Sequence, residues 1–187
     1  MDKVLEFVKK IISKKINVEI SIDATCGRGN DTKFLADISS KVYSFDIQKD
    51  AIDFSKESLG NYNNIQFIND SHEYVDRYVL EDIDVAMFNL GYLPKGDKNI
   101  TTQSASTIVS ISKMINKLKI NGIITVVCYP GHPQGKIESN DLLNYLKDIN
   151  QKEYDVVRYD FLNQINNPPF AIIIERIKWW EHLLESN

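Results

Sequence analysis

Short apolar runs alternate with amphipathic segments along most of this chain. Val, Leu and Ile recur on one side of residues 2–15 with helical spacing, whereas runs such as 83–88 are short and almost continuously apolar, as buried strands are. The pattern predicts helices over 2–15, 31–38, 51–59, 104–118 and 137–149, and strands over 18–24, 41–46, 65–68, 83–88, 123–129, 154–159 and 171–177. Strands that alternate with helices and end in a strand pair predict an α/β fold, with a mostly parallel seven-stranded sheet, an antiparallel edge strand and helices on both faces.

A loop with two glycines follows the first expected strand. Residues 20–32 read Ile-Ser-Ile-Asp-Ala-Thr-Cys-Gly-Arg-Gly-Asn-Asp-Thr and run from that strand into a helix. Ligands of Rossmann-like sheets bind at the carboxyl ends of the strands, and glycine lets the backbone approach them closely. Asp46 ends the next strand, about 20 residues later, where an acid can accept hydrogen bonds from ribose hydroxyls. Together these features predict a nucleoside cofactor.

The spacing of the loop favours S-adenosylmethionine (SAM) over NAD(P). Asp23-x-Thr25-x-Gly27-x-Gly29 follows the methyltransferase pattern of an acid and then glycines at alternate positions, whereas a dinucleotide fingerprint needs glycine at Thr32. An ordinary strand-to-helix turn is the structural alternative. The residues expected around the cofactor are Asp23, Thr25, Gly27, Gly29, Asn30, Asp31, Thr32, Asp46, Ile47, Gln48, Asp70, Ser71, His72, Asn89, Leu90 and Gly91.

Within that set, three residues have specific expected roles. Ile47 follows the ribose-binding acid and is expected to face the adenine ring. Asp70 follows the third strand, where a carboxylate can accept from the adenine amino group. His72 is a candidate for a ligand contact, although a lone histidine is more often structural or merely exposed.

A second distinctive loop begins where the fourth strand ends. Asn89-Leu90-Gly91-Tyr92 keeps the first and last members of the Asn-Pro-Pro-Tyr motif of methyltransferases that act on exocyclic amines. In that motif the asparagine oxygen accepts from the target nitrogen and the aromatic ring stacks on the base. We therefore expect Asn89 to orient an amine and Tyr92 to stack, with Asp97 as a weaker candidate for proton acceptance. Tyr92 is alternatively a packing aromatic.

Composition narrows the class of protein. The 187 residues carry a formal net charge of −4, so RNA would have to be bound by local basic patches. One domain over 1–187 is expected, with an N-terminal helix in 1–16 and a C-terminal tail in 178–187. No apolar run is long enough to cross a bilayer and no signal peptide is recognisable, so a cytoplasmic protein is expected. Two cysteines far apart in sequence argue against a metal site.

Taken together, these motifs resemble those of one family, the YtqB-type rRNA methylases now associated with the tRNA methyltransferase MnmM. The motifs are Asp23-Ala24-Thr25-x-Gly27-x-Gly29-x-Asp31-Thr32, Asn89-Leu90-Gly91-Tyr92-Leu93-Pro94, Gly96-Asp97-Lys98, Thr101-Thr102, Tyr129-x-Gly131-His132, Glu138, Asn163-Gln164 and Pro168-Pro169. The resemblance covers about Asp23 to Glu175 and implies a Rossmann-like class I methyltransferase that uses SAM. It also implies the reaction: methylation of the aminomethyl nitrogen of 5-aminomethyl-2-thiouridine at the tRNA wobble position, giving 5-methylaminomethyl-2-thiouridine.

That implied reaction suggests which residues meet the tRNA anticodon stem-loop. The substrate-facing candidates are Arg28, Tyr92, Lys95, Lys98, Thr101, Thr102, Tyr129, His132 and Asn163. Trp179 and Trp180 point to different sides of any regular element, and one of them could serve a homodimer interface or an RNA contact. The alternatives are methylation of rRNA or of a small-molecule amine, a non-catalytic SAM-binding partner, and an NAD(P) oxidoreductase.

Overall fold

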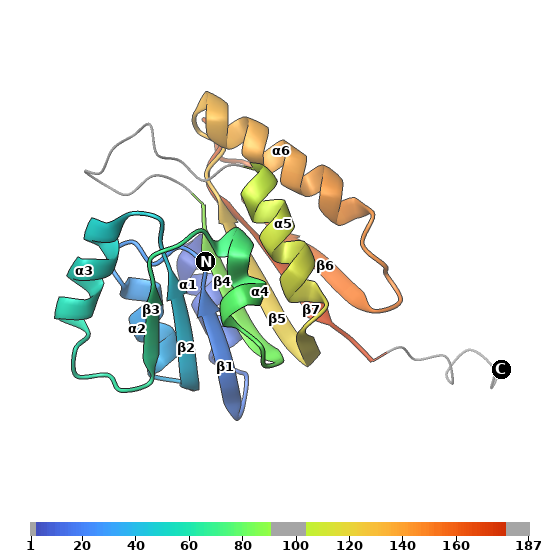
Figure 1. Cartoon of the computed structure of the whole chain (residues 1–187). Coiled ribbons are helices and arrows are strands. Elements are labelled where there is room, and N and C mark those ends of the chain that lie inside the picture. Colours follow the sequence, from blue (N-terminus) through green and yellow to red (C-terminus); the bar gives the residue numbers. More distant parts are fainter. Residues whose placement is uncertain (1–2, 91–103, 179–187) are drawn as a thin grey trace, which may run out of the picture.

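A computed structural model of the chain describes residues 3–90 and 104–178, and these form one seven-stranded sheet flanked by helices (Figure 1). The strands are β1 (Val18–Asp23), β2 (Ser39–Phe45), β3 (Ile65–Ile68), β4 (Ile83–Asn89), β5 (Leu118–Cys128), β6 (Tyr154–Tyr159) and β7 (Phe170–Arg176). The helices are α1 (Val4–Ile12), α2 (Asn30–Ala36), α3 (Lys49–Ser58), the 3-10 turn η1 (His72–Tyr74), α4 (Val75–Tyr78), α5 (Ser104–Ile115) and α6 (Pro133–Lys147).

The strand order β3-β2-β1-β4-β5-β7-β6 confirms the expected α/β fold. Pairs among β1 to β5 are parallel, whereas β7 is antiparallel to both of its neighbours, β5 and β6. The antiparallel strand therefore lies one position inside the edge rather than at it. Burial explains this difference: residues 170–174 of β7 are all buried, whereas most of β6 is exposed, so the more polar strand takes the edge.

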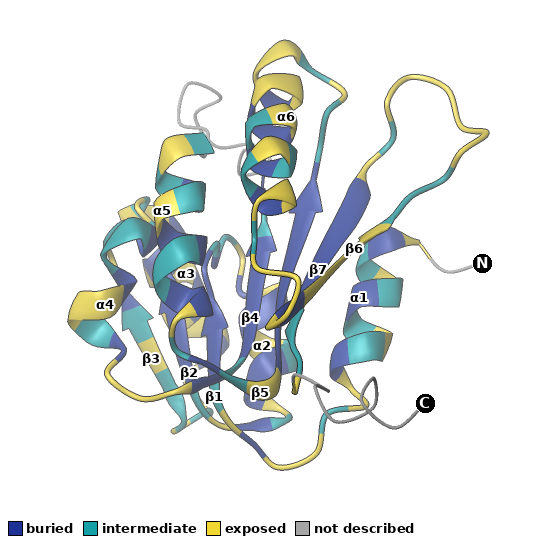
Figure 2. Cartoon of the chain, turned by 90° about the vertical axis from the view of Figure 1, so that its right-hand side faces the viewer, coloured by how far each residue is buried: buried dark blue, intermediate teal, exposed yellow. Residues whose placement is uncertain are grey.

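Two apolar cores cover the two faces of the sheet, as expected. Helices α4, α5 and α6 pack on one face through residues such as Val75, Ile111 and Leu142. Helices α1 and α2 pack on the other through Val8 and Leu35. In Figure 2 the strands between these layers are mainly buried, while the outer surface of α6 is mostly exposed. No helix in the described ranges is long and apolar enough to cross a membrane.

The start of β5 differs from the prediction. Residues 118–122 belong to the strand, whereas the sequence suggested a helix to 118 ended by Asn121 and Gly122. Asn121 has φ of 63°, and the β4–β5 register shifts between Ile83 and Val85, so these residues form an irregularity within the strand. The short helices η1 and α4 were not predicted, because they have too few residues to show helical periodicity.

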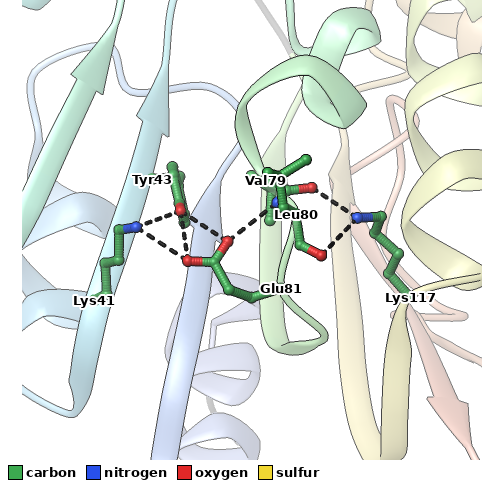
Figure 3. Close-up of polar contacts among 6 residues, drawn as sticks. All are labelled: Lys41, Tyr43, Val79, Leu80, Glu81 and Lys117. Carbon is green, nitrogen blue, oxygen red and sulfur yellow. Dashed lines mark hydrogen bonds and ion pairs between the residues drawn. The ribbon is translucent and has the colours of Figure 1, made fainter.

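A polar network closes the end of the sheet opposite the glycine loop (Figure 3). Glu81 accepts from the hydroxyl of Tyr43 at 2.9 Å and from the ammonium of Lys41 at 3.1 Å. Lys117 donates to the main-chain carbonyls of the two residues before Glu81. These contacts join β2 to the turn before β4 and the turn before β5, at the amino ends of these parallel strands. The glycine loop lies at the carboxyl ends, which form the opposite edge of the sheet.

Candidate active site

The glycine loop between β1 and α2 is shaped by backbone geometry that favours glycine. Gly27 and Gly29 have φ of 52° and 75°, in the left-handed region. A Cβ at Gly29 would lie 2.9 Å from Oγ of Ser55 and 3.0 Å from Cδ1 of Leu59, on the neighbouring segment 49–59. Gly29 is therefore explained by its positive φ and by tight packing against α3, and Gly27 by its positive φ.

Asp23, at the end of β1, is the most deeply buried acid in the loop region, with 1% exposure. It accepts hydrogen bonds from the main-chain N–H of Thr25 at 3.0 Å and from Oγ1 of Thr32 at 2.6 Å. Burial and the nearby charge of Asp31 raise its pKa to about 7. Thr32, which replaces the third glycine of a dinucleotide fingerprint, thus serves as a hydrogen-bond donor to the acid.

Asp46 joins the loops that follow β1 and β2. Its carboxylate accepts from the main-chain N–H of Gly27 at 2.8 Å and of Gln48 at 2.9 Å, while burial raises its pKa. Asn69 donates to the carbonyls of Asp46 and Ile47, a contact that the sequence did not suggest. The side chain of Ile47 is 54% exposed, so an apolar surface stands open beside this carboxylate.

The segment after β3 brings three further predicted residues to the same edge. Asp70 accepts from the hydroxyl of Tyr78 at 2.7 Å and from the N–H of Ser71 at 2.8 Å, which fixes its carboxylate. Nδ1 of the His72 ring lies 3.0 Å from the carbonyl oxygen of Ala24. Because a carbonyl only accepts, Nδ1 carries the hydrogen and Nε2 is an acceptor.

His72 is held in its neutral form. It is 8% exposed, and this burial lowers its pKa to about 4. Its ring packs edge-on against Phe88, with centroids 5.4 Å apart. Among the residues that the structure describes, Nε2 of His72 is the buried side-chain atom without a hydrogen-bond partner. Both proposed roles of this residue, structural and ligand-contacting, are compatible with that position.

Asn89 lies at the centre of contacts from several strand ends. Its main-chain N–H donates to Oγ1 of Thr25 at 2.8 Å. Its side-chain Oδ1 accepts from the hydroxyl of Tyr129 at 2.7 Å, and its Nδ2 donates to Asp31 at 3.4 Å. Asp31 in turn forms an ion pair with Lys9 of α1 at 2.7 Å. The structure thus brings Thr25, Asp31, Asn89 and Tyr129 together, and it adds Lys9, which was not predicted as a site residue.

Two of the substrate-facing candidates, His132 and Arg28, have structural contacts of their own. The ring of His132 caps α6, since its Nδ1 accepts from the N–H of Gly135 at 3.1 Å. The guanidinium of Arg28 lies over the ring of Phe54, 5.4 Å from the centroid, on α3. Asn163 is exposed in the connection between β6 and β7. Leu90, just after β4, is buried in the core with 1% exposure.

Asn30 is exposed at the first position of α2, and the other predicted residues not yet placed lie outside the described ranges. These are Gly91, Tyr92, Lys95, Asp97, Lys98, Thr101 and Thr102, together with Trp179 and Trp180 in the tail.

The charge and shape of this edge fit S-adenosylmethionine. Asp31 and Asp46 are close enough to Asp23 that their charges raise its pKa, so three carboxylates gather around the glycine loop. The sulfonium and ammonium of SAM are cationic and complement such a cluster. The fixed carboxylate of Asp46 beside the open side chain of Ile47 suits a ribose and an adenine. Within 3–90 and 104–178, no group of acids, histidines and cysteines is arranged to hold a metal ion.

Comparison with known proteins agrees with this geometry. The model of the "Putative rRNA methylase" family matches residues 42–175. A curated relative, the chloroplastic tRNA (mnm(5)s(2)U34)-methyltransferase of Arabidopsis thaliana, is 32% identical over 83% of the chain, which spans 62% of that protein's length.

Solved structures show the same relationship. The crystal structure of a putative rRNA methylase from Clostridium thermocellum matches this chain with a TM-score of 0.91 and 39% identity. The match covers 95% of this chain and 99% of the Clostridium thermocellum chain. A Streptococcus mutans methyltransferase in complex with S-adenosylhomocysteine (SAH) has a TM-score of 0.89 and 38% identity, with the same coverage. The chain therefore belongs to this family of putative rRNA methylases, and its cofactor is S-adenosylmethionine.

Proposed function

We propose that this protein methylates the aminomethyl nitrogen of 5-aminomethyl-2-thiouridine at the wobble position of tRNA. The observation that carries the proposal is the position of Asn89, whose amide oxygen lies at the carboxyl end of β4, next to the glycine loop. An amide oxygen has two lone pairs, so it can accept from an amine while it also accepts from Tyr129. The name of the Arabidopsis relative, which specifies a tRNA wobble uridine, supports the choice of substrate.

Each part of the site has a proposed task in this reaction. When bound, S-adenosylmethionine supplies an electrophilic methyl group, which the amine nitrogen takes from sulfur to leave SAH. Asp46 accepts from the ribose hydroxyls, Ile47 covers the adenine, and Asp70 accepts from the adenine amino group. Asp23 and Asp31 balance the positive charge of the cofactor through the glycine loop.

The residues around Asn89 orient the nucleophile. An alkylammonium has a pKa of about 10 in water, so the amine must lose a proton before it can attack. Asn89 accepts a hydrogen bond from the neutral amine, and Asp97 is our candidate for the proton acceptor. Holding nitrogen and methyl in attack geometry can contribute roughly 7–11 kcal/mol, so positioning alone accounts for much of the rate.

The tRNA is held by aromatic and basic side chains around the site. Tyr92 and Tyr129 are the proposed aromatic contacts to the flipped wobble base, and Arg28, Lys95 and Lys98 the proposed phosphate contacts. Thr101, Thr102, His132 and Asn163 complete the proposed substrate surface. We further propose that residues 1–187 act as one domain and that two copies associate to enlarge the RNA-binding surface.

Nucleoside analysis tests the reaction. tRNA from cells that lack the gene is incubated with the purified protein and methyl-labelled SAM, and the nucleosides are separated by mass spectrometry. We expect labelled 5-methylaminomethyl-2-thiouridine with the wild type. The Asn89→Ala variant should form it much more slowly while it still binds SAH. A labelled nucleoside of another kind would redirect the substrate, and equal turnover by Asn89→Ala would remove Asn89 from the mechanism.

A further inference from the structure

The side chain of Asn89 is one link in a chain of contacts that spans the site and reaches the N-terminal helix. Nζ of Lys9 lies 2.7 Å from Oδ1 of Asp31, and Oδ2 of Asp31 accepts from Nδ2 of Asn89 at 3.4 Å. On the other side, the hydroxyl of Tyr129 donates to Oδ1 of Asn89 at 2.7 Å. The four residues come from α1, α2, the end of β4 and the position after β5, so the chain joins elements that are far apart in sequence.

The chemistry of these groups fixes which way the amide of Asn89 points. An ionised carboxylate can only accept hydrogen bonds, so the NH₂ group of Asn89 must face Asp31. The oxygen is then turned to Tyr129, whose hydroxyl is able to donate. A flipped amide would set its oxygen against the Asp31 carboxylate and lose that hydrogen bond, whereas the hydroxyl of Tyr129 can donate or accept. Asp31 therefore sets the polarity of Asn89, and Tyr129 donates to the oxygen that this polarity presents.

Lys9 keeps this arrangement balanced in charge. The Asp31 residue is 8% exposed and lies close enough to Asp23 for its charge to act on that carboxyl group. The ammonium of Lys9 forms an ion pair with Asp31 from the α1 side, and it also lies 5.2 Å from the centroid of the Phe34 ring. The ion pair holds the Asp31 carboxylate in place from one side, and its other oxygen faces the NH₂ group of Asn89.

The lysines of the N-terminal segment could instead form a surface for RNA. Two of them have contacts within the protein that account for their positions. Lys9 pairs with Asp31, and Lys15 pairs with Glu175 and donates to the carbonyl of Asn121. The contact with Asp31 directs Lys9 toward the strand ends of the site, which favours a role inside the site over a role on the RNA-facing surface.

We propose that Lys9, Asp31 and Tyr129 are positioning residues that hold the amide of Asn89 with its oxygen turned toward the substrate amine, which makes helix α1 part of the methyl-transfer site. The inference rests on the proposed function, because it gives the task of Asn89 in that reaction. It assigns no direct contact between Lys9 and the substrate.

Kinetics of single and double variants test the coupling. Lys9→Met removes the ammonium but keeps an unbranched side chain, and Tyr129→Phe removes only the hydroxyl. We expect each to lower kcat by about tenfold to a hundredfold, with SAM affinity changed by no more than about twofold. Lys9→Arg should restore most of the activity, because a guanidinium also pairs with a carboxylate.

Two comparisons separate positioning from a general effect. In an Asn89→Ala background, Lys9→Met should lower kcat no further, because the amide on which it acts is gone. Lys14→Met, which removes a cation from an exposed position just after α1, should leave kcat near the wild-type value. An equal loss of kcat from Lys14→Met, or a full additional loss in the Asn89→Ala background, would overturn the proposal.

A spectroscopic measurement tests the geometry without any substrate. In protein labelled with ¹⁵N-asparagine, the side-chain NH₂ signal of Asn89 is identified by its absence in Asn89→Ala. We expect this signal to move or broaden in both Lys9→Met and Tyr129→Phe, and to stay in place in Lys14→Met. An unmoved signal in the first two overturns the positioning proposal. A wild-type protein that shows the coupled signal but labels no tRNA nucleoside would instead reject the proposed function.

Discussion

Replacing Asp23 by asparagine is expected to make the protein more stable and less able to bind its cofactor. The wild-type carboxyl group is 1% exposed and has a pKa of about 7, against 3.8 for an unperturbed aspartate. A carboxyl group with a raised pKa binds more protons in the folded state than in the unfolded state. The stabilising contribution of this carboxyl group to folding is therefore fully present below about pH 4 and is lost as the pH rises through about 7.

The size of this effect follows from the shift. About three pH units at 1.4 kcal/mol each give about 4 kcal/mol lost from the wild type at high pH. About 3 kcal/mol of this falls between about pH 5 and about pH 8.5. Asparagine keeps the shape of the side chain and has no charge to bury. The difference in free energy of unfolding between Asp23→Asn and the wild type should therefore grow by about 3 kcal/mol from about pH 5 to about pH 8.5, in favour of the variant.

Urea unfolding at the two pH values measures the stability, and isothermal titration calorimetry measures SAM affinity. Other titrating groups are common to both proteins and cancel in the difference. SAM affinity at high pH should fall by about tenfold in Asp23→Asn, because the substitution removes a negative charge that attracts the cationic cofactor across the glycine loop.

Glu138→Gln is the matched control. Glu138 is 5% exposed and its pKa is raised to about 7 by burial, so its replacement should give a similar pH-dependent gain in stability. It lies between α5 and α6, where it accepts from Thr107, so SAM affinity should not change. An Asp23→Asn variant whose advantage is the same at both pH values, or whose SAM affinity is intact, would refute the reasoning.

Two further substitutions test other parts of the site. The pKa of His72 is lowered to about 4, so its contribution to the free energy of unfolding is fully present above about pH 6.5, and about 3 kcal/mol is lost as the pH falls to about 4. His72→Gln should remove this pH dependence of stability in urea unfolding. An unchanged pH profile would contradict this reasoning. A Cβ at Gly135 would lie 2.2 Å from the carbonyl of Tyr129. Gly135→Ala should therefore lower the free energy of unfolding by about 1–3 kcal/mol and reduce kcat by moving Tyr129, whereas wild-type stability would show that the loop adjusts freely.

Hydrophobic patterning was sufficient to predict most of the fold. The strands expected at 65–68 and 154–159 have the same bounds in the structure, because each is a short β-prone run between turn residues. The place of β7 inside the sheet was not predicted, since it depends on how its burial compares with that of β6. The extended β5 was missed because residues 119–122 carry Asn and Gly, which usually end elements.

The site could be predicted only where a strand end marks it. Asp23, Asp46 and Asn89 follow apolar runs, and the topology of parallel strands brings such positions to one edge. The hydrogen bond between Tyr129 and Asn89 and the ion pair between Lys9 and Asp31 join separate elements. No local pattern encodes those pairings. Lys9 in particular looks like any other lysine on the polar side of an amphipathic helix.

Methylation of defined anticodon stem-loops tests the central claim most directly. One stem-loop carries 5-aminomethyl-2-thiouridine at the wobble position, and its partner carries 2-thiouridine there and is otherwise identical. With methyl-labelled SAM and the wild-type protein, we predict label in the first stem-loop only, recovered as 5-methylaminomethyl-2-thiouridine. Label in neither stem-loop from a protein that binds SAM, or equal label in both, would contradict transfer to the aminomethyl nitrogen.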